Sequence, residues 1–134
     1  MTGLLRKPAG TTGKVHDITP DNAGWGHVGF GLYRLAPGET AAEPTGDREA
    51  ILVLVEGRAR IGAEAREFGE MGDRLGVFDR RPPHAVYVPN GSDWRATATT
   101  ACTLAVCTAP GRGGHPAQVI GPAGIATETR GKGA

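Results

Sequence analysis

The residues of this chain that could bind a metal ion are its histidines and the carboxylates near them. Neutral imidazole and carboxylate groups are common protein ligands for zinc, iron, manganese and nickel. A close pair of histidines on one strand would be the clearest sign of such a site. The four histidines are instead scattered, at His16, His27, His84 and His115. We therefore assign no metal ligand and no catalytic residue to this chain.

A second set of polar residues could line a pocket for a sugar acid. The guanidinium fork of arginine matches the geometry of a carboxylate. Each of these side chains could equally be a solvated surface residue. The candidates for substrate binding are Arg48, Glu49, Arg74, Tyr87 and Arg95.

The cysteines, Cys102 and Cys107, lie in one apolar run, ACTLAVCTAP. If the run is a strand, their odd separation points them to opposite faces, about 17 Å apart along the chain. That distance is far beyond the reach of a disulfide. Two unpaired thiols suit a reducing compartment, and we expect small hydrophobic roles rather than catalysis.

Length and charge limit the possible classes of protein. The chain has 134 residues, the size of one domain, with 15 Lys+Arg against 14 Asp+Glu. This balance predicts no nucleic-acid partner. The first ten residues lack the apolar stretch of a signal peptide, and the longest apolar run, residues 50–55, is too short to cross a bilayer. We expect a soluble, cytoplasmic protein with no membrane partner.

Short apolar runs and frequent turn residues predict an all-β sandwich or barrel. Residues 50–61 form the clearest element, where an apolar run, the Glu56-Gly57 turn and an alternating segment predict a hairpin. We expect a loop at residues 40–47 and one helical turn, a loop or a bulge at 62–68. The other expected strands are residues 27–35, 72–78, 85–89, 94–99, 102–109 and 117–120.

The domain organisation follows from the same pattern. Residues 1–24 are polar and are expected to form an extended N-terminal arm or an edge strand. Residues 25–120 would form the barrel. Residues 121–134 are expected to be a linker, since the last of them, TETRGKGA, contain no core-forming material.

The stretch YVPNGSDW, residues 87–94, resembles the second motif of the cupin barrels, Pro-x-Gly-x-x-His. Pro89 and Gly91 match this motif, and Trp94 stands in the place of the metal-binding histidine. An indole at this place would project into the barrel and fill the volume that metal and substrate occupy elsewhere. The alternative is a tryptophan on the outer face, at an interface.

The first cupin motif is incomplete in the same way. Gly38 supplies its opening glycine, and Glu49 stands near the place of its acidic ligand. Pro44-Thr45-Gly46 occupies the positions where the motif has His-x-His. All three expected histidines are therefore absent, which predicts a cupin-type jelly-roll barrel without a metal.

Longer blocks of sequence resemble one particular family. The blocks GFGLYRLAPGET, REAILVLVEGRARI, MGDRLGVFDRRPPHAVYVPNG and AVCTAP, with TRGKG after them, look like the N-terminal half of 5-deoxy-glucuronate isomerase. This is the bacterial enzyme of inositol catabolism, related to 4-deoxy-L-threo-5-hexosulose-uronate ketol-isomerase. The likeness covers roughly residues 24–133.

The resemblance implies a bicupin, in which this chain is the metal-less N-terminal barrel. A divalent, zinc-like metal would then sit in a second, C-terminal barrel that is missing here. The reaction would convert the aldose 5-deoxy-glucuronate to the ketose 5-dehydro-2-deoxy-gluconate, and this barrel alone would be inactive. Its partners would be a small sugar acid and further copies of itself, in a homo-oligomer through barrel faces. The alternative is a stand-alone, non-catalytic cupin that binds a sugar acid or serves as an oligomerisation module.

Overall fold

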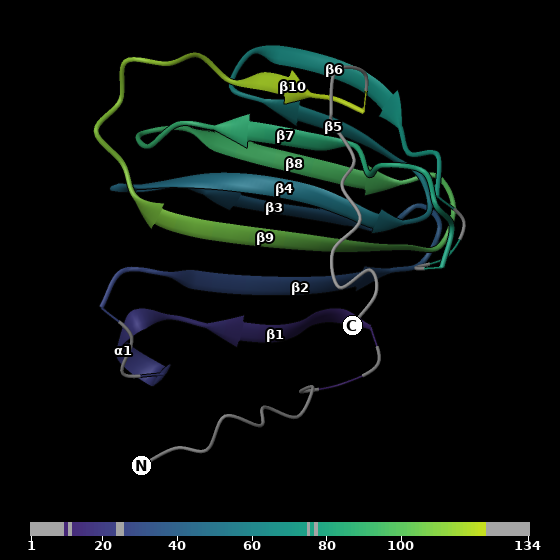
Figure 1. Ribbon diagram of the computed structural model, residues 1–134, viewed down its shortest axis with the longest axis horizontal. Coiled ribbons are helices and arrows are strands. Elements are labelled where there is room, and N and C mark those ends of the chain that lie inside the picture. The colour runs from purple at the N-terminus through teal and green to yellow at the C-terminus, as the bar shows by residue number, and fades with distance from the viewer. Residues whose placement is uncertain (1–9, 11, 24–25, 75, 77, 123–134) are drawn as a thin grey trace, which may run out of the picture.

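The computed structural model describes residues 10, 12–23, 26–74, 76 and 78–122. The described residues fold into two antiparallel β-sheets and contain one short helix. The six-stranded sheet has the order β1-β2-β9-β4-β7-β10, and the four-stranded sheet has the order β3-β8-β5-β6. In Figure 1 the strands of both sheets run across the view, with β1 lowest.

Most strands begin and end close to turn residues of the sequence. In chain order the elements are β1 (Gly13–Ile18), α1 (Pro20–Ala23), β2 (Gly29–Leu35), β3 (Thr40–Pro44), β4 (Arg48–Glu56), β5 (Ala59–Ala63), β6 (Arg66–Met71), β7 (Ala85–Val88), β8 (Asp93–Ala98), β9 (Cys102–Pro110) and β10 (Gln118–Ile120). This confirms the predicted all-β class and the predicted strands at 27–35, 85–89, 94–99, 102–109 and 117–120, with small shifts of their ends.

Strand β4 shows how the core forms between the two sheets. Successive side chains of a strand point to opposite faces, so every second residue enters the interior. Leu52 and Leu54 are accordingly buried, while Ile51, which points to the opposite face, is 41% exposed. Burying a leucine side chain stabilises the fold by about 1.5–3 kcal/mol. The alternation of β4 therefore fixes which face of the six-stranded sheet covers the core.

Strand β1 forms the edge of the six-stranded sheet and pairs with β2. The pairing contains an irregularity between Lys14 and His16, which leaves Val15 without a partner in the register. Lys14 lies opposite Tyr33, and His16 lies opposite Leu32. Since Tyr33 is buried in the core, this register places Lys14 on the inner face of the sheet. The edge-strand alternative is therefore confirmed for residues 13–18, while residues 1–9, 11 and 24 of the predicted N-terminal segment lie outside the described residues.

The expected hairpin over residues 50–61 is wrong. Strands β4 and β5 belong to different sheets, so the chain crosses from one layer to the other at Gly57. A glycine is needed there, because its φ is 84° and a Cβ atom would collide with the carbonyl oxygen of Ala101. The sequence indicated the turn correctly, but the partner of each strand depends on residues far along the chain.

Three further local expectations are also corrected. Residues 40–44 are not a loop, because they form β3 and pair with β8, while residues 45–47 of the expected loop lie outside any strand. Residues 62–68 contribute to a real hairpin, β5–β6, whose turn holds Glu64 at a φ of 56°. The described residues of 72–78 do not form a strand. In the first two cases the local sequence lacked a clear alternation, and pairing with a neighbouring strand decided the structure.

The two cysteines follow the prediction for opposite faces of one strand. Cys102 is buried and Cys107 is exposed, and neither forms a disulfide. Burial raises the pKa of the Cys102 thiol, so it remains protonated and unreactive. The expected linker lies almost wholly outside the described residues, since its residues 123–134 are among those the structure does not describe. No helix in the described part of the chain is long and apolar enough to cross a membrane.

Candidate functional site

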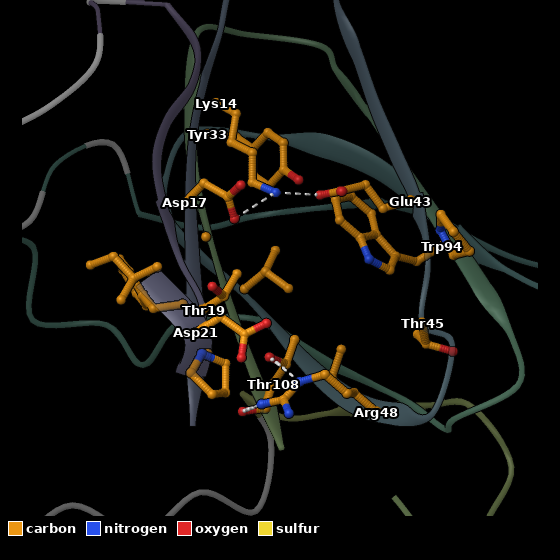
Figure 2. A pocket seen from close by; sticks show the side chains of 18 of the residues that line it. Lys14, Asp17, Thr19, Asp21, Tyr33, Glu43, Thr45, Arg48, Trp94 and Thr108 are labelled. Atoms are coloured by element: carbon orange, nitrogen blue, oxygen red, sulfur yellow. Dashed lines mark hydrogen bonds and ion pairs between the residues drawn. The ribbon is translucent and has the colours of Figure 1, made fainter. Parts of the chain in front are cut away.

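A cavity of about 470 Å³ opens at one end of the barrel interior. Residues of β1, β2, β3, β4, β8 and β9 line it, together with the segment around α1. Figure 2 shows side chains from these elements converging on the cavity from several sides. The charged side chains that the strands contribute stand at or next to strand ends: Lys14 and Asp17 in β1, Glu43 in β3 and Arg48 in β4.

The cavity exists because two inward-facing positions of β2 lack side chains. Gly29 and Gly31 share the inner face with Tyr33 and Leu35, since alternate residues of a strand point the same way. A Cβ on Gly31 would lie 3.4 Å from the Lys14 side chain. A larger side chain at this position would therefore extend into the space that the cavity now occupies.

One wall of the cavity carries a small charged network centred on Lys14. The Lys14 ammonium donates to Glu43 at 3.0 Å and forms an ion pair with Asp17 at 3.3 Å. Burial lowers the pKa of Lys14, but hydrogen bonds to Glu43 and Asp17 and their negative charges outweigh burial, so the pKa is raised. The side chain is therefore a fixed cation at neutral pH. It also lies over the Tyr33 ring, 5.5 Å from its centroid.

Two aromatic rings form the apolar floor between these polar walls. Tyr33 and Trp94 meet edge to face, with ring centroids 5.6 Å apart and planes at 84°. Trp94 is only 3% exposed, which confirms that it projects into the barrel rather than onto the outer face. The Tyr33 hydroxyl is buried and has no hydrogen-bond partner among the described residues.

Arg48 forms the opposite wall and is the one predicted substrate-binding residue that lines the cavity. Its Nε donates to the Thr108 hydroxyl at 3.1 Å, and its Nη2 donates to the Thr108 carbonyl at 3.1 Å and to the His27 carbonyl. Figure 2 shows Asp21 on the same side of the cavity. The guanidinium is thus held in one orientation by the ends of β2, β4 and β9.

Glu49 and Tyr87 lie together, but on the outer face of the six-stranded sheet. They alternate with the buried residues Ala50 and Val88, and the Tyr87 hydroxyl donates to Glu49 at 2.9 Å. Burial, and then the hydrogen bond and negative charge of Glu49, raise the pKa of Tyr87. This pair contributes nothing to the cavity.

The remaining two candidates also lie away from the cavity. Arg95 is on the outer face of the four-stranded sheet, where it pairs with Glu67 at 2.6 Å and donates to the Glu64 carbonyl at 3.0 Å. Arg74 follows β6, and its carbonyl accepts a hydrogen bond from the Gly57 amide at 2.7 Å. Since Gly57 follows the far end of β4, Arg74 lies at the opposite end of the barrel from Arg48.

Sequence reasoning did not identify most of the residues that line the cavity. Lys14, Asp17 and Glu43 were not singled out, nor were Tyr33 and Thr108. Glycines at alternate positions of a strand, as in GFG at residues 29–31, were the available signal, because they mark a face with space beside it. The partner residues could not be found that way, since they come from strands distant in sequence.

The positions of the cupin metal ligands do not fit a metal in this barrel. Proline and glycine offer no side-chain donor, and the Trp94 indole donates a hydrogen bond but has no lone pair for a cation. The Thr45 hydroxyl is engaged, donating to the Pro89 carbonyl at 2.8 Å and accepting from the Ser92 amide at 2.8 Å. Among the described His, Cys, Asp and Glu residues, no group of three is arranged to hold a metal ion.

Comparison with known proteins gives consistent results across most of the chain. A model of the KduI/IolB family matches residues 4–134. The 5-deoxy-glucuronate isomerase of Geobacillus thermodenitrificans is 43% identical over 121 residues, which cover 90% of this chain and 44% of that protein. The enzyme of the same name from Halalkalibacterium halodurans is 34% identical, over 99% of this chain and 51% of that protein. The chain thus spans about half the length of the relatives it matches.

Solved structures show the same relation in three dimensions. The crystal structure of an IolB-like protein from Salmonella typhimurium has a TM-score of 0.94 and 40% identity, covering 98% of this chain and 50% of that one. A mutant of Bacillus subtilis oxalate decarboxylase has a TM-score of 0.56 and 15% identity, covering 78% of this chain and 27% of that one. The second likeness shows the fold alone. This likeness and the two antiparallel sheets of the chain together confirm the predicted cupin-type barrel.

Proposed function

The chain belongs to the KduI/IolB family, and we propose that it forms the N-terminal cupin barrel of a 5-deoxy-glucuronate isomerase. The observation that carries this proposal is the similarity to relatives of that name along almost the whole chain. The match to about half of each relative supports a second barrel in the functional enzyme. The residues of this barrel support a non-catalytic role for it in that enzyme.

The proposed reaction is an aldose–ketose isomerisation in myo-inositol catabolism. It converts 5-deoxy-glucuronate to 5-dehydro-2-deoxy-gluconate by moving a proton between neighbouring carbons, with a positioned base to carry it. A divalent metal would supply Lewis-acid stabilisation of the enediolate. No step of this chemistry is assigned to the described residues, because Pro44, Gly46 and Trp94 stand where cupin ligands would be.

The role proposed for this barrel is to pack against other barrels and to support the catalytic one. Homo-oligomer contacts through its faces are part of the proposal, supported by the exposed Ile51 on the outer face of the six-stranded sheet. A cytoplasmic location is also part of it, supported by Cys102 and Cys107, which are free thiols.

A chimera tests the proposed function directly. The segment of the Geobacillus thermodenitrificans enzyme that aligns with this chain would be replaced by this chain, and isomerisation of 5-deoxy-glucuronate would be assayed. We expect the chimera to turn over substrate and to bind one metal ion, and this chain alone to do neither. Turnover by the chain alone would contradict the non-catalytic role. A chimera that folds and binds the metal but is inactive would contradict the proposal that this chain is the N-terminal barrel of such an isomerase.

A second candidate function is a stand-alone barrel that binds a sugar acid without turning it over. The position of the Arg48 guanidinium on the cavity wall is the observation behind it, because a guanidinium suits a carboxylate, although the three carboxylates that also line the cavity count against it. Binding of D-glucuronate to this chain, lost in Arg48→Met and unaffected in Arg95→Met on the outer face, would support this reading over the isomerase.

A further inference from the structure

We propose that the barrel cavity is a binding site for an uncharged polyhydroxylated molecule, such as a monosaccharide or a linear polyol. This site goes beyond the isomerase function and does not depend on it. The argument uses the size of the cavity, one buried hydroxyl without a partner, and the charges on its walls.

The cavity has the size and composition of a small-molecule site. Its volume of about 470 Å³ lies within the range of about 300–1,000 Å³ that is usual for ligand pockets. Such pockets combine an apolar floor with a few convergent polar groups. Here Tyr33 and Trp94 provide the floor, and charged groups from β1, β3 and β4 face one another across it (Figure 2).

The Tyr33 hydroxyl is the observation that points most directly to a ligand. Its oxygen is buried, no described residue hydrogen-bonds to it, and the residue as a whole is 6% exposed. Buried polar groups are nearly always hydrogen-bonded, because burial without a partner costs free energy. A ligand hydroxyl in the cavity could both donate to this oxygen and accept from it.

The carboxylates on the walls suit hydroxyl donors. The side chain of Asp17 is 61% exposed and that of Glu43 is 42% exposed, and Asp21 is also exposed. An ionised carboxylate only accepts hydrogen bonds, and each one has two oxygens. Lys14 uses one oxygen of Asp17 and one of Glu43. Adjacent hydroxyl groups of a polyol are the natural donors for the others.

The same charges disfavour an anionic ligand. Three carboxylates line the cavity against two cations, Lys14 and Arg48. Lys14 is already paired with Asp17 and Glu43, and Arg48 is bonded to Thr108 and to a backbone carbonyl. A carboxylate in the cavity would meet carboxylates of like charge without a cation reserved for it. An uncharged polyol would meet no such repulsion.

Equilibrium binding to the full chain tests the proposal with matched probes. D-glucose, D-galactose and sorbitol are the uncharged probes, and D-glucuronate is the acid that matches glucose in ring shape. Isothermal titration and ligand-observed NMR would give the dissociation constants. We expect at least one uncharged probe to bind, and glucuronate to bind at least about tenfold more weakly than glucose.

Paired variants locate the binding in the cavity. Tyr33→Phe removes only the unpartnered hydroxyl, and we expect it to weaken binding about three- to tenfold. Tyr87→Phe removes the other described tyrosine hydroxyl, which lies on the outer face and bonds Glu49, and should leave the dissociation constant unchanged. Gly31→Val extends into the cavity from β2 and should abolish binding while the circular dichroism spectrum remains that of the unmodified chain.

Three results would overturn the proposal. One is failure of all three uncharged probes to bind, which would mean that the cavity holds water alone. Another is an equal effect of Tyr33→Phe and Tyr87→Phe, or no effect of Gly31→Val, which would place any binding elsewhere. Binding of glucuronate as tight as that of glucose would contradict the uncharged class and support the sugar-acid reading instead.

Discussion

The two ends of the barrel interior are built by the same strands but have opposite character. At the pocket end, β2 contributes Gly29 and Gly31 and β4 contributes Arg48. At the other end, which we call the leucine end, the inner faces of β2, β4 and β9 carry the buried side chains Leu35, Leu54, Leu104 and Cys102. Along β2 and β4 the inner-facing residues therefore change from small or polar to large and apolar.

The glycines of the two ends differ in the same way. At the leucine end, Gly57 and Gly72 lie where the backbone of one segment meets the backbone of another, and a Cβ on Gly72 would collide with the Gly57 carbonyl. At the pocket end, the atoms nearest to a Cβ on Gly31 would be side-chain carbons of Lys14 and Tyr33, at 3.4 and 3.6 Å, and the nearest backbone atom would be 3.9 Å away. Gly57 and Gly72 thus allow close backbone packing at the leucine end, while the absence of a side chain at Gly31 leaves space for the cavity. The same residue type has different roles because its neighbours differ.

The largest expected effect comes from removing a side chain at the leucine end. Leu104→Ala should lower the free energy of unfolding by about 3–5 kcal/mol, because a tightly packed site loses buried area and gains a cavity. Leu104 is 0% exposed. Ile51→Ala, on the outer face, is the matched control and should cost about 1 kcal/mol or less. Urea denaturation would measure both, and equal losses would show that the leucine end is not the main source of stability.

Gly57→Ala should have the next largest effect, a loss of about 2–3 kcal/mol. A positive φ costs an ordinary residue about 1–2 kcal/mol, and here the added Cβ also meets the carbonyl of Ala101. Gly38 is the control, since its φ is 88° and no atom lies within 4 Å of its missing Cβ. Gly38→Ala should therefore cost only the conformational part, about 1–2 kcal/mol. Equal losses of unfolding free energy for Gly57→Ala and Gly38→Ala, in thermal or urea unfolding, would show that the close backbone contact at Gly57 does not matter for stability.

The smallest expected effect concerns the charged network at the pocket end. Lys14→Met should cost less than about 1 kcal/mol at neutral pH, because the ion pairs of Lys14 are partly exposed and screened. The pKa of Lys14 is raised above 10.5 in the folded chain. The contribution of Lys14 to the free energy of unfolding is therefore complete below its pKa in the unfolded chain. It is lost as the pH rises through its pKa in the folded chain.

The measurement is the difference in unfolding free energy between the unmodified chain and Lys14→Met from pH about 9 to about 12. Tyr87 has a raised pKa too, but it is present in both proteins, so its effect cancels. Arg95→Met removes an exposed ion pair with Glu67, and its effect should not change over this range, because arginine remains charged. A difference for Lys14→Met that stays constant with pH would contradict the assignment of Lys14 to this network.

Several features of the fold could be predicted from the sequence because they depend on neighbouring residues. The alternation in residues 27–35 and 102–109 predicted strands β2 and β9, and the odd separation of Cys102 and Cys107 predicted their opposite faces. The position of Trp94 after Pro-x-Gly predicted an inward-facing indole. Each of these predictions needed only the periodicity of a strand or a short motif.

The tertiary structure decided which strands meet, and with that the site. Glu56-Gly57 turns the chain into the other sheet because β4 pairs with β7 and β9 rather than with β5. Of the five predicted substrate-binding residues, only Arg48 reached the cavity, because the others point outward or lie beyond the far end of the strands.

The sequence by itself determined most of the strands and the family resemblance, through local alternation and short motifs. The tertiary structure alone decided that Lys14, Tyr33 and Arg48 surround one cavity. These residues come from β1, β2 and β4, and β9 lies between β2 and β4 in the sheet although it comes much later in the chain. Pairing between distant strands depends on the summed burial of both sheets, which no short segment of sequence contains.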